Sequence, residues 1–282
     1  MIYREVCIIG TGLIGGSMGL LIKELMPEIR LTAVDLPDVI DNLPDNSPFD
    51  RTATRENLAD VLSSADLILL AMPIGAVIDI LPEVISLAKD RSVISDTGSV
   101  KRDILSCAET HKTPEIFFIG GHPIEGSELQ GFENASSELL SGAKFIICPA
   151  KDVPSELLKN HIDFLASLKF EVIEMDAETH DKTTAYTSHL PQLISTALAL
   201  TAGTVGEANL TAGPGFSSMT RLAMSPPEIW EDIFDHNRDE FKHAVYSFSI
   251  ILTNLIADVE NGTIREKFIS AANARSKISG DI

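Results

Sequence analysis

The sequence predicts an α/β protein, in which a doubly wound sheet is followed by an all-helical domain, and three observations lead to this fold class. Short β-branched and apolar runs alternate with helical stretches over residues 1–175, which is typical of parallel strands joined by right-handed crossovers. A glycine-rich turn joins the first predicted strand to the first helix. After Asp176 the predicted strands stop, so we expect a helical second domain over residues 176–282.

The elements of the first domain follow one another closely along the chain. Its strands are expected at residues 6–10, 31–35, 66–73, 92–96, 116–122, 143–149 and 170–175, with the last two extending the same sheet. Its helices are expected at residues 13–26, 74–89, 100–109 and 155–168. The segment 35–50 is rich in Pro, Asp and Asn, which predicts a loop.

The helical domain is expected to begin with a long helix that runs from its N-cap, Asp176, to about residue 205. Pro191 must bend or interrupt this helix, because proline has no N–H to donate. The sequence SPPE at 225–228 has the form of a capping box. A further helix is predicted from an apolar seam with steps of four and three residues: Phe241, Val245, Phe248, Leu252 and Leu255.

Composition limits the classes of partner. The chain has 22 Lys and Arg against 41 Asp and Glu, a formal charge of −19, which repels nucleic acids and anionic membranes. The apolar start of the chain is broken by glycines, so we interpret it as part of the fold rather than as a signal peptide, and no other segment is apolar enough to predict a membrane span. The three cysteines show neither metal-binding nor disulfide spacing, which favours the cytoplasm.

The sequence GTGLIG at 10–15 fits the dinucleotide-binding pattern of a Rossmann-type sheet, between a predicted strand and a predicted helix. Gly10 would allow the turn, Gly12 would let a pyrophosphate approach the helix N-terminus, and Gly15 would let the helix pack closely. Asp35 ends the second strand near the expected spacing, and its carboxylate would bind the ribose of NAD and repel the 2′-phosphate of NADP. The alternative is a glycine-rich turn in an unrelated α/β protein.

Two further motifs follow predicted strands, at the edge where open α/β sheets bind ligands. In DTGSVK, Ser99 could bond a substrate hydroxyl, although Thr97 and Ser99 could instead only cap the next helix. In GGHP, His122 would face the crevice that holds the cofactor. Its imidazole can accept the proton of a substrate hydroxyl as hydride leaves the carbon that carries this hydroxyl. The alternative for His122 is a structural hydrogen-bonding role.

Two positions in the helical half are also candidates. His189 lies just before the bend expected at Pro191, which could turn its side chain into a cleft, but a capping or surface histidine is the alternative. Arg221 lies in a mostly apolar stretch, where a guanidinium needs an anion such as a carboxylate. The alternative for Arg221 is a structural ion pair.

Together these segments resemble the prephenate/arogenate dehydrogenases of tyrosine biosynthesis. The resemblance covers nearly the whole chain, through IIGTGLIGGS, LLAMP, DTGSVK, GGHPIEGSELQG, SHLP and TRLAMSPPEIWEDIFDHN, and the GGHP-x-x-GSE-x-x-G stretch is its most specific part. It implies an NAD(P)-binding Rossmann domain and a helical domain through which two subunits dimerise. It also implies oxidative decarboxylation of an anionic cyclohexadienyl acid to a 4-hydroxyphenyl product.

The resemblance implies roles for individual residues. His122 would bond the ring 4-hydroxyl and take up its proton, while Ser99 would help to hold that hydroxyl and the nicotinamide. Arg221 would bind the substrate carboxylate, His189 would line the pocket, and Glu128 would lie near the pocket mouth. No metal is implied. The cofactor-binding residues are expected to be Gly10, Thr11, Gly12, Leu13, Ile14, Gly15, Asp35, Met72 and Pro73.

We therefore expect a homodimeric, NAD-dependent prephenate dehydrogenase that produces 4-hydroxyphenylpyruvate, with no separate regulatory domain. Ser217 and Ser218 offer no acid to the ammonium group of arogenate, which favours prephenate. Glu125 stands where the family usually has a small residue, and its carboxylate could disfavour an anionic substrate. Arogenate or an amino analogue of prephenate remains an alternative substrate. A further hypothesis is a β-hydroxyacid or imine dehydrogenase. Such enzymes typically rely on a lysine in the helical domain, and the segment 176–225 contains only Lys182, which disfavours them. Another hypothesis is a non-catalytic NAD sensor.

Overall fold

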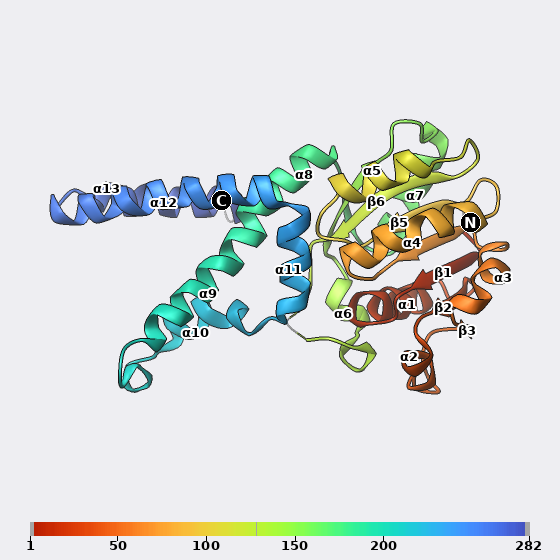
Figure 1. Ribbon diagram of the computed structural model, residues 1–282, viewed down its shortest axis with the longest axis horizontal. Helices are drawn as coiled ribbons and strands as arrows, with labels where there is room; N and C mark the ends of the chain where they lie inside the picture. Colours follow the sequence, from red (N-terminus) through yellow and green to blue (C-terminus); the bar gives the residue numbers. More distant parts are fainter. Residues whose placement is uncertain (1–2, 128, 280–282) are drawn as a thin grey trace. The chain divides into compact units, whose positions relative to one another are not determined.

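The computed structural model describes residues 3–127 and 129–279, and the chain forms two compact units, Met1–Asn237 and Arg238–Ile282. The first unit contains one large sheet with its helices, followed by helices α8 to α11 (Figure 1). The second unit consists of α12 and α13.

The sheet has eight strands in the order β3-β2-β1-β4-β5-β6-β7-β8. All neighbours pair in parallel except β6 and β7, which are antiparallel. The doubly wound sheet is confirmed, together with its extension by the last two strands. The strands are β1 (Glu5–Ile9), β2 (Arg30–Val34), β3 (Arg51–Ala53), β4 (Leu67–Leu70), β5 (Val93–Asp96), β6 (Phe117–Pro123), β7 (Lys144–Pro149) and β8 (Glu171–Glu174).

The helices of the first unit follow the predicted order, with one correction. Pro37 starts a short helix, α2, inside the segment that was expected to be a loop, because its fixed backbone angle suits a first helical turn. The helices are α1 (Leu13–Leu25), α2 (Pro37–Asp41), α3 (Leu58–Leu62), α4 (Ile74–Leu87), α5 (Arg102–His111), α6 (Ser137–Leu140), α7 (Ser155–Ser167), α8 (Ala177–Thr184), α9 (Leu190–Gly203), α10 (Pro214–Thr220) and α11 (Pro227–His236).

Both faces of the sheet are buried. Along β1, Cys7 and Ile9 join one apolar core with side chains of α3, α4 and α5, while Val6 and Ile8 join a second core with α1 and α7. Alternate residues of a strand point to opposite faces, so one strand feeds both cores. Each fully buried aliphatic side chain contributes about 1.5–3 kcal/mol. This burial fixes the sheet whose carboxyl edge carries the candidate residues.

The helix expected from Asp176 to residue 205 is divided. Asp176 is its N-cap, as predicted, because its carboxylate accepts a hydrogen bond from the Thr179 backbone N–H at 2.8 Å. A wide π-helical turn, Ala185–His189, separates α8 from α9. It directly precedes Leu190 and Pro191, and the missing N–H of Pro191 removes one bond of the regular helical series. The interruption places His189 at a buried junction between the two helices.

The predicted SPPE capping box is wrong. Helix α11 begins at Pro227, its N-cap is Pro226, and no side chain caps its first turn. Ser225 precedes the N-cap, so its hydroxyl is one residue too early to act as the cap. The two prolines preset the backbone of this helix start instead.

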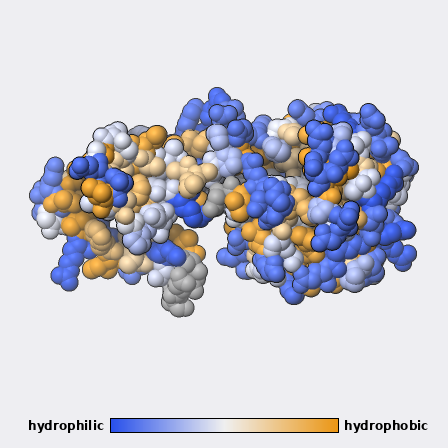
Figure 2. All heavy atoms as spheres, turned by 90° about the horizontal axis from the view of Figure 1, so that it is seen from below, coloured by the Kyte–Doolittle hydropathy of each residue, from blue (hydrophilic) through white to orange (hydrophobic). Residues whose placement is uncertain are grey.

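The second unit contains α12 (Arg238–Glu260) and α13 (Ile264–Ser279), which pack against each other. Apolar side chains remain on its surface; Tyr246, Phe268 and Ile278 are 69%, 72% and 74% exposed. Figure 2 shows apolar side chains spread over the helical segments. Such surfaces commonly mark sites of protein association. Across residues 3–127 and 129–279, no helix has both the length and the apolar character needed to cross a membrane.

Candidate active site

The glycine motif forms a tight turn between β1 and α1. Gly10 has φ +92°, and a Cβ there would lie 2.4 Å from the Ala71 carbonyl oxygen. A Cβ on Gly15 would lie 1.9 Å from the Gly10 carbonyl oxygen, whereas one on Gly12 would meet nothing within 4 Å. Gly12 is the N-cap of α1. Two of the three glycines are therefore required by packing, and the third leaves open space at the helix N-terminus.

Asp35 follows β2 and lies against the glycine turn. Its Oδ2 accepts hydrogen bonds from the backbone N–H and the hydroxyl of Thr11, at 2.6 and 2.8 Å. These bonds hold the carboxylate at the carboxyl edge of the sheet, where α1 begins. The first turn of α1 and the loop after β4 lie at this edge too, and they contain the remaining predicted cofactor residues: Leu13, Ile14, Met72 and Pro73.

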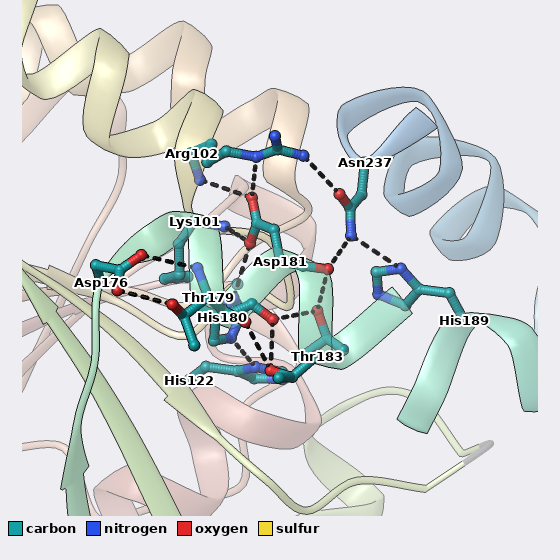
Figure 3. Close-up of polar contacts among 12 residues, drawn as sticks. Lys101, Arg102, His122, Asp176, Thr179, His180, Asp181, Thr183, His189 and Asn237 are labelled. Atoms are coloured by element: carbon teal, nitrogen blue, oxygen red, sulfur yellow. Dashed lines mark hydrogen bonds and ion pairs between the residues drawn. The ribbon is translucent and has the colours of Figure 1, made fainter. Parts of the chain in front are cut away.

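His122 lies near the carboxyl end of β6 and is half-buried. Its Nδ1 is 2.8 Å from Nε2 of His180, and the two rings meet edge to face at 67° (Figure 3). Nδ1 of His180 is in turn 2.8 Å from Oδ1 of Asp181. Both α8 residues are fully buried. The three side chains form a continuous hydrogen-bonded row, called here the His122 row.

Asp181 sets the direction of the bonds in the His122 row. Burial opposes its charge, but hydrogen bonds from His180 and from the backbone N–H groups of Arg102 and Lys101 keep the pKa of Asp181 below its usual value. An ionised carboxylate can only accept, so Nδ1 of His180 carries the hydrogen. With His180 neutral, its Nε2 accepts from Nδ1 of His122. Nε2 of His122 is then the ring nitrogen that keeps a lone pair.

Both histidines of the row have depressed pKa values. Burial, followed by the nearby His180, Lys101 and His189, lowers the pKa of His122 well below its usual value. Burial also lowers the pKa of His180, although Asp181 opposes this effect. Both rings are therefore neutral near neutral pH, as the bond directions require.

Gly121, the residue before His122, is held through both its backbone carbonyl oxygen and its backbone N–H. Nζ of the fully buried Lys101 donates to the Gly121 carbonyl oxygen at 2.6 Å and pairs with Asp96. Asp96 in turn accepts from the Gly121 N–H at 3.1 Å. A Cβ on Gly121 would lie 2.4 Å from the Asp96 carbonyl oxygen, so only glycine fits. His122 is thus fixed through its backbone and its ring.

The start of α5 is capped from α8 rather than by its own loop. The backbone N–H groups of Lys101 and Arg102 donate to the two carboxylate oxygens of Asp181, at 2.7 and 2.9 Å. No side chain caps α5 from its own loop. The alternative that Thr97 and Ser99 only cap this helix is therefore wrong. Ser99 is half-buried on the loop between β5 and α5.

His189 is buried beside the His122 row. Nδ2 of Asn237 donates to the Asp181 carbonyl oxygen at 2.7 Å and lies 3.3 Å from Nδ1 of His189. Since an amide nitrogen is a donor, Nδ1 of His189 accepts and Nε2 carries the hydrogen. Among the described residues this buried Nε2 has no partner. Burial lowers the pKa of His189 to about 4, so the ring is neutral.

Arg221 lies on another element, the 3-10 turn Arg221–Met224, and is exposed. The next two residues of this turn are tied to α9, the helix that follows His189. Gln192 donates to the Leu222 carbonyl oxygen at 2.8 Å, and the next backbone N–H donates to Ser195 at 3.0 Å. Glu128 lies outside the described residues. Glu125, on the same loop, is exposed.

Five residues of this site were not identified from the sequence. The sequence gives little indication of these residues, because most of them bind groups that are distant along the chain. Asp181 contacts the start of α5, and Lys101 contacts β6. A buried lysine is rarely expected from sequence, and adjacent His and Asp residues match no metal or catalytic spacing. The missed residues are Asp96, Lys101, His180, Asp181 and Asn237.

Comparisons with known proteins agree over nearly the whole chain. The family model described as "Prephenate dehydrogenase, nucleotide-binding domain" matches residues 49–174, and "Prephenate dehydrogenase, dimerization domain" matches 176–271. A cyclohexadienyl dehydrogenase of Zymomonas mobilis is 27% identical, over 99% of this chain and 98% of the relative. A prephenate dehydrogenase of Lactococcus lactis is 30% identical, over 83% of this chain and 65% of its own length.

A solved structure is similar as well. The crystal structure of prephenate dehydrogenase from A. aeolicus, in complex with hydroxyphenyl propionate and NAD+, has a TM-score of 0.88 and 27% identity, and the match covers 98% of each chain. The fold, the family models and the relatives all point the same way. The chain belongs to the prephenate/arogenate/cyclohexadienyl dehydrogenase family and is an enzyme of the prephenate dehydrogenase type.

Proposed function

We propose that this protein catalyses the NAD-dependent oxidative decarboxylation of prephenate to 4-hydroxyphenylpyruvate. The observation that carries the proposal is the His122 row, which leaves Nε2 of His122 as an unprotonated base. This base lies near the carboxyl end of β6, at the same edge of the sheet where β1 ends at the glycine turn and β2 ends at Asp35. The family membership and the relatives named above support the same reaction.

The glycine turn fits a dinucleotide. The open space at Gly12 lies at the N-terminus of α1, where unpaired backbone N–H groups favour a pyrophosphate. Asp35 is held beside it. Its Oδ2 already accepts two hydrogen bonds from Thr11, whereas Oδ1 accepts one, from the Leu36 N–H, and keeps a lone pair for a ribose hydroxyl. Its charge opposes the 2′-phosphate of NADP, which favours NAD. When bound, NAD supplies the hydride acceptor.

The chain's own residues then have two tasks. His122, with Ser99, would hold the ring 4-hydroxyl, so that the C4–H bond keeps one orientation. As hydride leaves C4, the hydroxyl proton passes to Nε2 of His122, the bond from C1 to the carboxylate breaks, and CO2 leaves. The proton then returns to the phenolate oxygen, which gives the 4-hydroxyphenyl product. The ring becomes aromatic, which supplies the driving force. The protein therefore needs orientation and one proton acceptor.

The substrate's second carboxylate needs donors. Arg221 and the Nε2–H of His189, which has no partner among the described residues, are the candidates. Ser217 and Ser218 carry no charge to meet an ammonium group, which favours prephenate over arogenate. Glu125 is exposed to solvent, which would limit its repulsion of an anionic substrate.

Arogenate is the second candidate, because of one observation. Nε2 of Gln192 donates to the Leu222 carbonyl oxygen, which leaves the amide oxygen as an acceptor, and within the described residues this buried oxygen has no partner. An ammonium group is a donor that would satisfy it, whereas the ketone of prephenate is not. Gln192 follows His189 by one helical turn, so the two side chains lie on one side of α9.

The second expected property is a homodimer. The family model called a dimerization domain covers residues 176–271, and the helical segments keep exposed apolar side chains such as Leu200, Tyr246 and Phe268. A second copy of the chain would remove this surface from water. Light scattering of the purified protein measures the oligomeric state directly.

The test of the reaction is comparative kinetics with prephenate, arogenate and an amino analogue, each with NAD and with NADP. We expect the highest kcat/KM with prephenate and NAD. His122→Asn should lower kcat by about 100- to 10,000-fold and leave NAD binding unchanged. Turnover with none of the three substrates, or full activity of that variant, would overturn the proposal.

A further inference from the structure

We propose that His180 is a positioning residue that fixes the tautomer of His122 and receives its Nδ1 proton during the reaction. The proposal rests on the function proposed above. His180 would touch neither substrate nor cofactor, because both of its ring nitrogens are occupied. Its Nε2 is bonded to His122 and its Nδ1 to Asp181, at 2.8 Å each. Figure 3 shows this row and its connection to Asn237 and His189.

Asp181 anchors the His122 row. Asp181 is fully buried, and both of its oxygens are bound to the start of α5 through the N–H groups of Lys101 and Arg102. The guanidinium of Arg102 adds a bond at 3.2 Å. A carboxylate held by three donors besides His180 cannot rotate without breaking several bonds. The Nδ1–H of His180 is therefore held in one direction.

The bond from His180 selects the tautomer of His122. A neutral histidine free in water carries its hydrogen mainly on Nε2, which would make that nitrogen a donor. In the row, His180 presents a lone pair to Nδ1 of His122, so the hydrogen is held on Nδ1 instead. His180 thus reverses the ordinary preference and leaves Nε2 able to accept a proton. A histidine held in the wrong tautomer loses its function as a base even when its position is unchanged.

The His122 row also provides a place for the positive charge that forms during the reaction. A proton accepted at Nε2 would make His122 a cation in a buried setting where its pKa is held low, partly by Lys101. If the Nδ1 proton moves to Nε2 of His180, one proton enters His122 and one leaves it, and no electrons are exchanged. The positive charge then lies beside the Asp181 carboxylate, which stabilises it. The protons then return by the same route, and Nε2 of His122 gives its proton back to the phenolate oxygen left by the loss of CO2, which completes the 4-hydroxyphenyl product.

A purely structural role makes a different prediction. The joint between α8 and α5 is made by Asp181 through backbone N–H groups, and it does not use Nε2 of His180. If His180 only fills space, His180→Phe should leave the tautomer of His122 unchanged. If His180 fixes the tautomer, His180→Gln should keep it, since the amide oxygen can accept from Nδ1 of His122 but cannot take up a proton.

The direct test is the protonation of the His122 ring in the full-length, nitrogen-15-labelled protein without ligands, read from long-range proton–nitrogen NMR spectra. The His122 signals are identified by their loss in His122→Asn. We expect the hydrogen on Nδ1 in the wild type and in His180→Gln, and a shift toward Nε2 in His180→Phe. A wild-type ring with its hydrogen on Nε2 overturns the proposal, and so does an unchanged tautomer in His180→Phe.

Kinetics provide the second measurement. We expect kcat to fall at least about tenfold in His180→Phe and less in His180→Gln. This loss is a part of the roughly 100- to 10,000-fold effect of a general base. The KM for NAD should not change in either variant. The matched control is His161→Gln, a buried histidine of α7 that bonds Tyr3 and should not alter kcat. Equal kcat in His180→Phe and the wild type contradicts the proposal.

The two measurements separate this proposal from the proposed function. The NMR spectra need no substrate, so the expected tautomer with no turnover of any of the three substrates would support His180 and overturn the reaction. Turnover of prephenate with the hydrogen on Nε2 would do the reverse. If His180→Phe fails to fold, the wild-type spectrum and His180→Gln still decide the tautomer.

Discussion

The ammonium group of Lys101 pairs with the carboxylate of Asp96 entirely inside the protein, at the end of strand β5. Each partner also binds the backbone of Gly121, the residue before His122. The pair therefore connects two neighbouring strands at the point where the proposed base emerges. A buried charge of this kind is tolerated because its partner and the backbone satisfy it.

Removing one partner should be costly. Lys101→Met leaves the Asp96 carboxylate buried without its cation, and we expect the free energy of unfolding to fall by about 3–5 kcal/mol. Urea denaturation measures it. The control is Lys112→Met, whose solvent-exposed pair with Glu109 at 2.9 Å should leave the free energy of unfolding almost unchanged. Equal losses in the two variants would show that burial of the Lys101 pair is not important for stability.

The glycine turn allows a matched pair of variants. Gly15→Ala would place a Cβ 1.9 Å from the Gly10 carbonyl oxygen, so we expect a lower melting temperature. Gly12→Ala meets no atom within 4 Å, so stability should hold while NAD affinity falls, because the methyl group fills the space proposed for the pyrophosphate. Calorimetry and NAD titration measure the two effects. Unchanged NAD affinity in Gly12→Ala would place the phosphates elsewhere.

Asp35 should control the choice of cofactor. Asp35→Asn keeps an oxygen that can accept from Thr11 but removes the charge that opposes a 2′-phosphate. We expect kcat/KM with NADP to rise at least about tenfold relative to that with NAD, since like charges in contact cost several kcal/mol. Initial rates with both cofactors give the ratio. A ratio equal to that of the wild type would separate Asp35 from the ribose site.

Stability should depend on pH through His161. This side chain is 1% exposed, and burial lowers its pKa to about 4, while the unfolded chain keeps a value near 6.5. Between these values the unfolded state binds a proton that the folded state does not. The free energy of unfolding therefore falls as pH falls from 6.5 toward 4, by about 1.4 kcal/mol per pH unit for this group.

The variant His161→Gln can keep a bond to Tyr3 and does not titrate. Its free energy of unfolding, measured by denaturation between pH 6 and pH 5, should fall less than that of the wild type by about 1.4 kcal/mol. The matched control is His243→Gln, because the side chain of His243 is 74% exposed and should not alter the slope. Identical slopes for His161→Gln and the wild type would contradict the assignment.

Local patterns in the sequence predicted most of the fold. The glycine turn between β1 and α1, the alternation of strands and helices, and the Asp176 cap each depend on residues within a few positions of one another, and the structure confirms these three features of the fold. Strand β3 has only three residues, too few to show an alternating pattern, and was missed. The antiparallel pairing of β6 with β7 was not predicted, because orientation depends on the path of the intervening chain.

The site was predicted only in part, for the same reason. His122, Asp35 and the glycines belong to short motifs, whereas the residues that orient His122 are distant in sequence. Asp181 lies far along the chain from the helix start that it caps, and no periodicity or spacing connects them. Lys101 belongs to the DTGSVK motif, but nothing in the sequence indicates that its side chain is buried. Contacts of this kind arise from packing and not from local propensity.

The capping of α5 by α8 has a consequence for experiments that exchange parts between relatives. The family models divide the chain between residues 174 and 176, whereas the first compact unit extends to Asn237. A chimera joined at that division would combine the imidazole of one parent with the orienting pair of the other. Crossover points after Asn237 keep His122, His180 and Asp181 from a single parent.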